Sequence, residues 1–95
     1  MDDPSLDDFA RSVGESFQVE TDEGPLTLTL KRALPLPGPT IRPNGSSFAL
    51  HWLGPAEPLL PQGTYSLSGE GKAFELFIVP IVQDESGTTY EAVFN

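Results

Sequence analysis

Only one histidine, His51, is available for metal binding or acid–base chemistry, and the chain has no cysteine. A zinc or iron site with one histidine would need several carboxylates converging on it. A catalytic triad would need a serine in a nucleophile-elbow pattern, and none occurs. His51 also falls on the strand face opposite Phe48, Leu50 and Trp52. We therefore predict a histidine at the surface or core boundary, with no catalytic, metal or cofactor role.

Paired carboxylates occur as Asp7–Asp8 and as Asp84–Glu85. Acid–base catalysis needs environments that move two pKa values apart. Asp84 and Glu85 fall in the turn "QDESG", where both are expected to be solvated. Asp7 and Asp8 fall in the first turn of a predicted helix, where negative charge suits the helix dipole. Neither pair indicates an active site.

Glu91 lies in "YEAVFN" with apolar neighbours on both sides. We predict that it faces outward and pairs across strands with Lys31 or Arg32. "SGEGK" is too short for a phosphate loop and precedes a strand, so it is interpreted as a hairpin turn. Trp52 and Tyr65 could stack on a sugar if exposed, but their place in the alternation favours core packing.

The charged residues are unevenly distributed along a chain whose net charge is −9. Residues 1–23 hold eight acids and one base (−7), and residues 24–95 hold six acids and four bases (−2). Free nucleic acid is an unsuitable partner because phosphate binding needs a basic surface. The acidic N-terminus does not resemble a secretory signal, and no stretch approaches the roughly 20 apolar residues of a membrane span. We expect a cytoplasmic protein, or one that joins an extracellular assembly without a cleaved signal peptide.

The apolar periodicity predicts one helix followed by six strands. Leu6, Phe9, Ala10 and Val13 share one helical face. From Gly14 onward the period changes to two. The predicted helix covers about 5–13, and the strands about 16–20, 26–34, 48–54, 63–68, 74–82 and 88–95. The phase slips near Lys31–Arg32, which predicts a bulge there, and Pro80 marks an edge, a bulge or a strand end.

These elements predict a single domain, 1–95, of the mainly β class. We expect a small six-stranded antiparallel, partly closed barrel, with the short N-terminal helix packed across one opening or over the "FELFIVPIV" strand. We expect that strand to be buried on both faces. A two-sheet β-sandwich is the alternative.

Several phrases are similar to those of an uncharacterised family of small bacterial domains of unknown function. They are "F…VGESFQV", "SFALHWLGP", "LLPQGTYSLSG", "FELFIVPI" and the terminal "YEAVFN". The resemblance covers essentially the whole chain, and "PQGTY" and "YEAVFN" are its specific parts. It implies genes near those of tail-collar-like surface or fibre proteins of phage type, and no catalytic residues.

Three functions are considered. The first is a non-catalytic protein-interaction module, not an enzyme, that caps, anchors or chaperones a tail-collar-like surface or fibre protein. The alternatives are an acidic decoy or inhibitor of phage type and a small carbohydrate-binding or enzymatic β-barrel. Stiff proline loops lose little entropy on binding. The predicted partner-binding residues are therefore Pro35, Pro37, Pro39, Ile41, Arg42, Pro55, Pro58 and Leu59.

Overall fold

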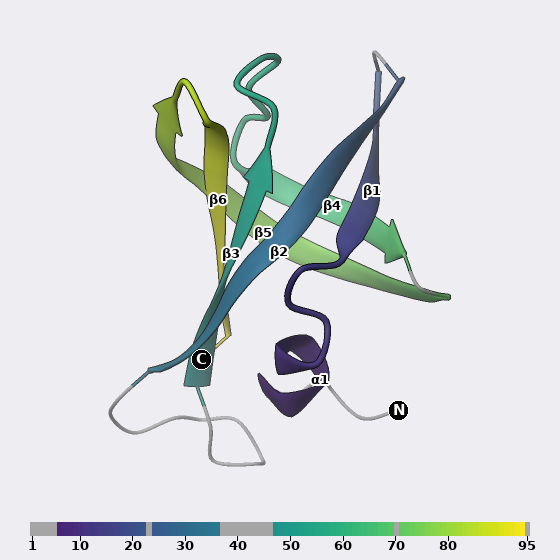
Figure 1. Ribbon diagram of the computed structural model, residues 1–95. Helices are drawn as coiled ribbons and strands as arrows, with labels where there is room; N and C mark the ends of the chain where they lie inside the picture. Colours follow the sequence, from purple (N-terminus) through teal and green to yellow (C-terminus); the bar gives the residue numbers. More distant parts are fainter. Residues whose placement is uncertain (1–5, 23, 37–46, 70, 95) are drawn as a thin grey trace.

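The computed structural model describes residues 6–22, 24–36, 47–69 and 71–94. It contains one helix and six strands within these ranges, as Figure 1 shows. The elements are α1 (Leu6–Ala10), β1 (Ser16–Thr21), β2 (Gly24–Leu36), β3 (Ser47–Gly54), β4 (Gly63–Gly69), β5 (Lys72–Asp84) and β6 (Gly87–Phe94). Across the described part of the chain, no helix is both long enough and apolar enough to span a bilayer.

The strands form one antiparallel sheet that closes on itself in the order β1-β2-β3-β6-β5-β4. The predicted mainly β, six-stranded antiparallel fold with one short helix is therefore confirmed. The two-sheet sandwich is excluded because β1 pairs with both β2 and β4. The pairing that closes the sheet is nevertheless short, since β1 and β4 share only the residue pairs Gln18–Ser68 and Val19–Leu67.

The ring consists of two three-stranded meanders, β1–β2–β3 and β4–β5–β6. The first hairpin of each meander, β1–β2 and β4–β5, has the same strand pairing when residue numbers are shifted by a constant. Phe17 pairs with Leu28 in the first, and Tyr65 pairs with Leu76 in the second, so both offsets are 48 (65 − 17 and 76 − 28). At the β1–β4 junction Val19 pairs with Leu67, which is the same offset of 48 (67 − 19). The two halves therefore face each other as structural counterparts.

Each long strand carries one irregularity in its pairing. The β2–β3 register shifts between Leu30 and Arg32, and the β5–β6 register shifts between Pro80 and Val82. The first is the bulge predicted from the phase slip. The second lies at the proline that cannot donate to a ladder. Bulges bend strands and increase twist, which helps a six-stranded sheet to curl closed.

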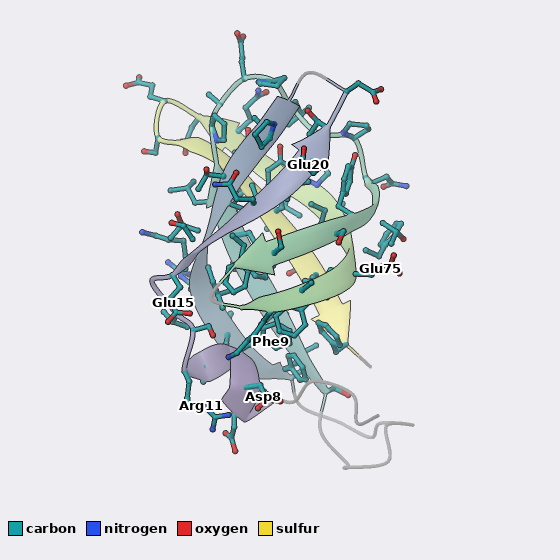
Figure 2. All side chains as sticks on the ribbon, turned by 90° about the vertical axis from the view of Figure 1, so that its right-hand side faces the viewer. Asp8, Phe9, Arg11, Glu15, Glu20 and Glu75 are labelled. Atoms are coloured by element: carbon teal, nitrogen blue, oxygen red, sulfur yellow. The ribbon has the colours of Figure 1, made fainter. Side chains whose placement is uncertain are left out.

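The interior is filled by the inward residues of the strands and by one residue at each end. Phe9 of α1 is 1% exposed and lies near Phe48, Phe74 and Phe94, with ring centroids 4.9–5.9 Å apart. Figures 1 and 2 show α1 across one end of the barrel, with Phe9 directed into it. Leu60 fills the other end, where its backbone N–H donates to the buried Tyr90 hydroxyl at 2.9 Å.

The helix is shorter than the predicted range 5–13, and Ser5 lies outside the described residues. After Ala10 the chain turns and docks on β2, where Gly14 N–H donates to the Leu30 carbonyl at 2.7 Å and Leu30 N–H donates to the Glu15 carbonyl at 3.0 Å. Gly14 has a φ of +96°, which favours glycine. Docking on β2 therefore replaces the last predicted turn of the helix.

Two strands are longer than predicted, by two residues at each end. β2 begins at Gly24 and ends at Leu36, and β5 runs from Lys72 to Asp84. Pro35 extends β2 opposite Phe48, so the predicted start of a proline loop is still strand.

Candidate functional site

The predicted partner-binding residues fall into two segments. Pro37, Pro39, Ile41 and Arg42 lie outside the described residues. Pro35 is an exposed residue of β2, paired with Phe48. Of the residues predicted in this segment, Pro35 alone lies on the described surface, and it does so from a strand.

The segment 55–62 is fixed to the end of the second meander. The Ala56 carbonyl accepts from Gln83 Nε2 at 2.6 Å and from Thr88 Oγ1 at 3.3 Å. Leu60 is buried in the core, whereas Leu59 is 46% exposed. Pro55 and Pro58 are also exposed. Of the eight predicted residues, these three therefore form an ordered, partly apolar rim beside β5 and β6.

Glu91 does not pair with Lys31 or Arg32 as predicted. Its Oε2 lies 3.0 Å from His51 Nε2, because β3 and β6 place the two residues directly opposite each other. His51 is half-buried, as predicted for a boundary histidine. Arg32 pairs with His51 from the other side, so β3 separates Arg32 from Glu91. The alternation was interpreted correctly, but the neighbour of β6 was not β2.

The two candidate sugar-stacking residues do not form an exposed pair. Trp52 is fully buried and meets Phe17 edge to face at a centroid distance of 5.3 Å. Its Nε1 has no hydrogen-bond partner among the described residues. Tyr65 is half-buried and its hydroxyl donates to the Pro61 carbonyl at 2.7 Å. Both residues serve packing, as the alternation predicted.

One carboxylate of each candidate pair is held by a local contact. Asp84 Oδ1 accepts from Ser86 N–H at 2.8 Å within the β5–β6 turn. Asp8 Oδ1 lies 2.8 Å from Arg11 on the outside of α1, away from the barrel (Figure 2). Over residues 6–22, 24–36, 47–69 and 71–94, no three histidine, cysteine or acidic side chains gather where they could hold a metal ion.

The most distinctive surface is one that the sequence did not predict. Both faces of the "FELFIVPIV" strand were expected to be buried, and this is wrong for its outward face. Phe77 is 55% exposed, Ile81 45% and Val82 50%. Val93 on β6 is 47% exposed. We call the set Phe77, Val79, Ile81, Val82 and Val93 the β5–β6 outer face.

The register explains how these residues come together. Val79 pairs with Glu91, so Phe77 and Val93 lie on the same outward side, two residues from that pair. The bulge after Pro80 leaves Ile81 unpaired and places Val82 opposite Thr89. Ile81 and Val82 are consecutive yet both exposed, because a bulge disturbs the alternation of faces. Pro80 was the sequence signal for this irregularity.

Comparison with known proteins agrees with the motifs noted in the sequence. No curated protein matches the chain, and no solved structure matches it. The family model of the domain of unknown function DUF6916 matches residues 4–94. This range contains each of the phrases that carried the resemblance, from "VGESFQV" to the phenylalanine of "YEAVFN". The chain therefore belongs to the DUF6916 family of domains of unknown function.

Proposed function

We propose that the chain is a non-catalytic protein-interaction module that binds its partner through the β5–β6 outer face. The observation that carries this proposal is the exposure of Phe77, Ile81 and Val82 along one strand, with Val93 beside them. Single exposed apolar residues are common, but a contiguous group of them is typical of an interaction site. Leu59, in the loop whose Ala56 carbonyl is bonded to Gln83 and Thr88, is also exposed.

The barrel itself does not require these outward residues. The counterparts of Glu75, Phe77 and Val79, 48 positions earlier, are Thr27, Thr29 and Lys31. These polar residues occupy the equivalent outward positions of β2, so a strand of this barrel can form with polar residues there. The apolar character of β5 is therefore best explained by something that covers it.

The partner class that we propose is a tail-collar-like surface or fibre protein. The support for this part is the resemblance of the sequence phrases, which implies genes near those of such proteins. In this role the barrel caps or escorts an apolar surface of the larger protein. Burial of four or five aliphatic and aromatic side chains would supply most of the binding free energy.

The proposal is tested by co-purification from the native host with the wild type and with a Phe77→Thr/Ile81→Thr double variant. Threonine keeps the β propensity of both positions, so the variant is expected to fold. We expect the wild type to recover a specific protein that the double variant loses.

The matched control is Val13→Thr, which removes an apolar side chain of similar exposure (45%) from the turn after α1. It should recover the same protein as the wild type. Circular dichroism and thermal melting establish that all three proteins are folded. Recovery of an identical set of proteins by the wild type and the double variant would contradict the proposal.

A further inference from the structure

The charges around the β5–β6 outer face are almost all negative. Residues 72–94 contain Glu75, Asp84, Glu85 and Glu91, with Lys72 as their single base, which gives −3 (one minus four). Glu75, Asp84 and Glu85 are exposed. Figure 2 shows Glu75 on the outside of the barrel, away from the core.

These acids lie along the apolar side chains in the strand register. Glu75 precedes Phe77 by two residues on the outward side of β5, and Asp84 follows Val82 by two. Glu91 lies directly opposite Val79, in the middle of the face, and its Oε2 also contacts His51 Nε2 on β3 at 3.0 Å. The apolar surface is therefore acidic at both ends and crossed by one carboxylate.

The backbone of this face is already used within the barrel. β6 pairs with β3 on one side and with β5 on the other. Because β6 is flanked by a strand on each side, we take the occupant to lie on the outward side chains. An amphipathic helix laid over a sheet buries one apolar stripe in this way.

The negative charge of this face favours helices that carry basic residues, and it disfavours a second copy of the same acidic chain as the occupant. Two copies meeting through this face would oppose Glu75, Asp84 and Glu91 to the same residues, in chains of net charge −9. Like charges at an interface cost several kcal/mol. A helix with lysine or arginine beside its apolar stripe would instead be attracted by these carboxylates.

We infer that the β5–β6 outer face binds a cationic amphipathic helix of another protein. Its apolar stripe packs on Phe77, Val79 and Ile81, and its basic flanks lie against Glu75 and Glu91. This inference rests on the proposed function and adds the chemistry of the partner.

The experiment uses the full chain, labelled with ¹⁵N, and two synthetic helical peptides as probes. Both carry leucine along one face. The other face is lysine in the first peptide and glutamate in the second. We expect the Leu/Lys peptide to shift the amide signals of residues 77–82 and 91–93, and its affinity to fall as salt is raised. The Leu/Glu peptide should leave these signals unchanged.

Variants separate the apolar and the charged contributions. Glu75→Gln combined with Glu91→Gln should weaken Leu/Lys binding by about twofold to tenfold, the range expected for two partly exposed ion pairs. Glu20→Gln removes an exposed acid from β1 in the other half and should leave the affinity unchanged. Phe77→Thr should remove binding at this face altogether.

The outcomes distinguish this inference from the proposed function. Equal binding of both peptides, or shifts centred on α1, overturns the inference of a cationic helix. The proposed function survives that result if the Phe77→Thr/Ile81→Thr variant still loses the host protein. The proposed function fails separately if that variant keeps the host protein.

Discussion

The two meanders of the barrel have the same interior but different exteriors. Phe17 and Leu28 of the first half correspond to Tyr65 and Leu76 of the second, and all four side chains face the core. On the outside, threonines and a lysine of β2 correspond to Glu75, Phe77 and Val79 of β5. The inward positions are therefore constrained by packing in both halves, whereas the outward positions are free to follow function.

The two junctions between the halves also differ. β3 and β6 share seven residue pairs, from Phe48–Phe94 to Gly54–Thr88. β1 and β4 share two. The β3–β6 junction therefore carries most of the pairing between the halves, and the apolar outer face adjoins this better-ordered side. A binding surface next to the stronger junction is held rigid, which lowers the entropy lost on binding.

The largest expected effect comes from the shared interior. Leu28→Ala and Leu76→Ala remove counterpart side chains that are 0% and 4% exposed. Each should lower the free energy of unfolding by about 2–5 kcal/mol, since a buried leucine leaves a cavity. Urea unfolding measures both. Thr27→Ala and Glu75→Ala, at neighbouring outward positions, should change it by no more than about 0.5 kcal/mol. A near-neutral result for one leucine alone would show that the interiors are not equivalent.

A smaller effect is expected at the stronger junction. Gly87 has a φ of +132°, and a Cβ there would meet the Gly54 carbonyl oxygen of β3. Gly87→Ala should cost about 2–3 kcal/mol because the strained backbone and the close contact act together. Gly71→Ala is the control, since Gly71 also has a positive φ (+74°) but open space around it. It should cost about 1 kcal/mol. Equal thermal shifts for the two variants would mean that the contact with β3 is unimportant.

The smallest effect is expected on the outside. Phe77→Thr gives β5 the residue type that its counterpart, Thr29, has in β2. The melting temperature should scarcely change, with a difference in unfolding free energy of about 0.5 kcal/mol or less, because Phe77 is 55% exposed. The reverse change, Thr29→Phe, should likewise leave stability unchanged. A large loss of stability in Phe77→Thr would assign this phenylalanine to the fold instead of to binding.

The sequence predicted the features of the fold that depend on local pattern. Alternation identified all six strands. Pro80 and the phase slip at Arg32 marked the two bulges, because each interrupts the alternation within a few residues. The predicted strand 74–82 already crossed Pro80. The structure extends it by two residues at each end, because the pairing with β4 continues to Lys72 and the pairing with β6 continues to Asp84, and local pattern does not contain these partners.

The features that depend on strand order could not be predicted from local pattern. The partner of Glu91 follows from β6 lying between β3 and β5, and alternation does not contain this order. The exposure of Phe77 was missed because a strand with apolar residues on both faces is equally typical of full burial and of a binding surface. Only the placement of α1 across the barrel end (Figure 1), which leaves the outward side of β5 uncovered, distinguishes the two.

The barrel consists of two meanders of one chain that pack together as two subunits of a dimer would. Each meander is assembled from neighbouring strands, and the loop 55–62 is the covalent link that keeps the two at a high effective concentration. Two chains opened at the junctions could instead exchange meanders, each β1–β2–β3 unit closing on the β4–β5–β6 unit of its neighbour. Leu60 fixes this link to the second meander. Because it is buried in the core and hydrogen-bonded to Tyr90 of β6, the link stays docked on the β4–β5–β6 unit, and only the few residues before it could act as the hinge of such an exchange.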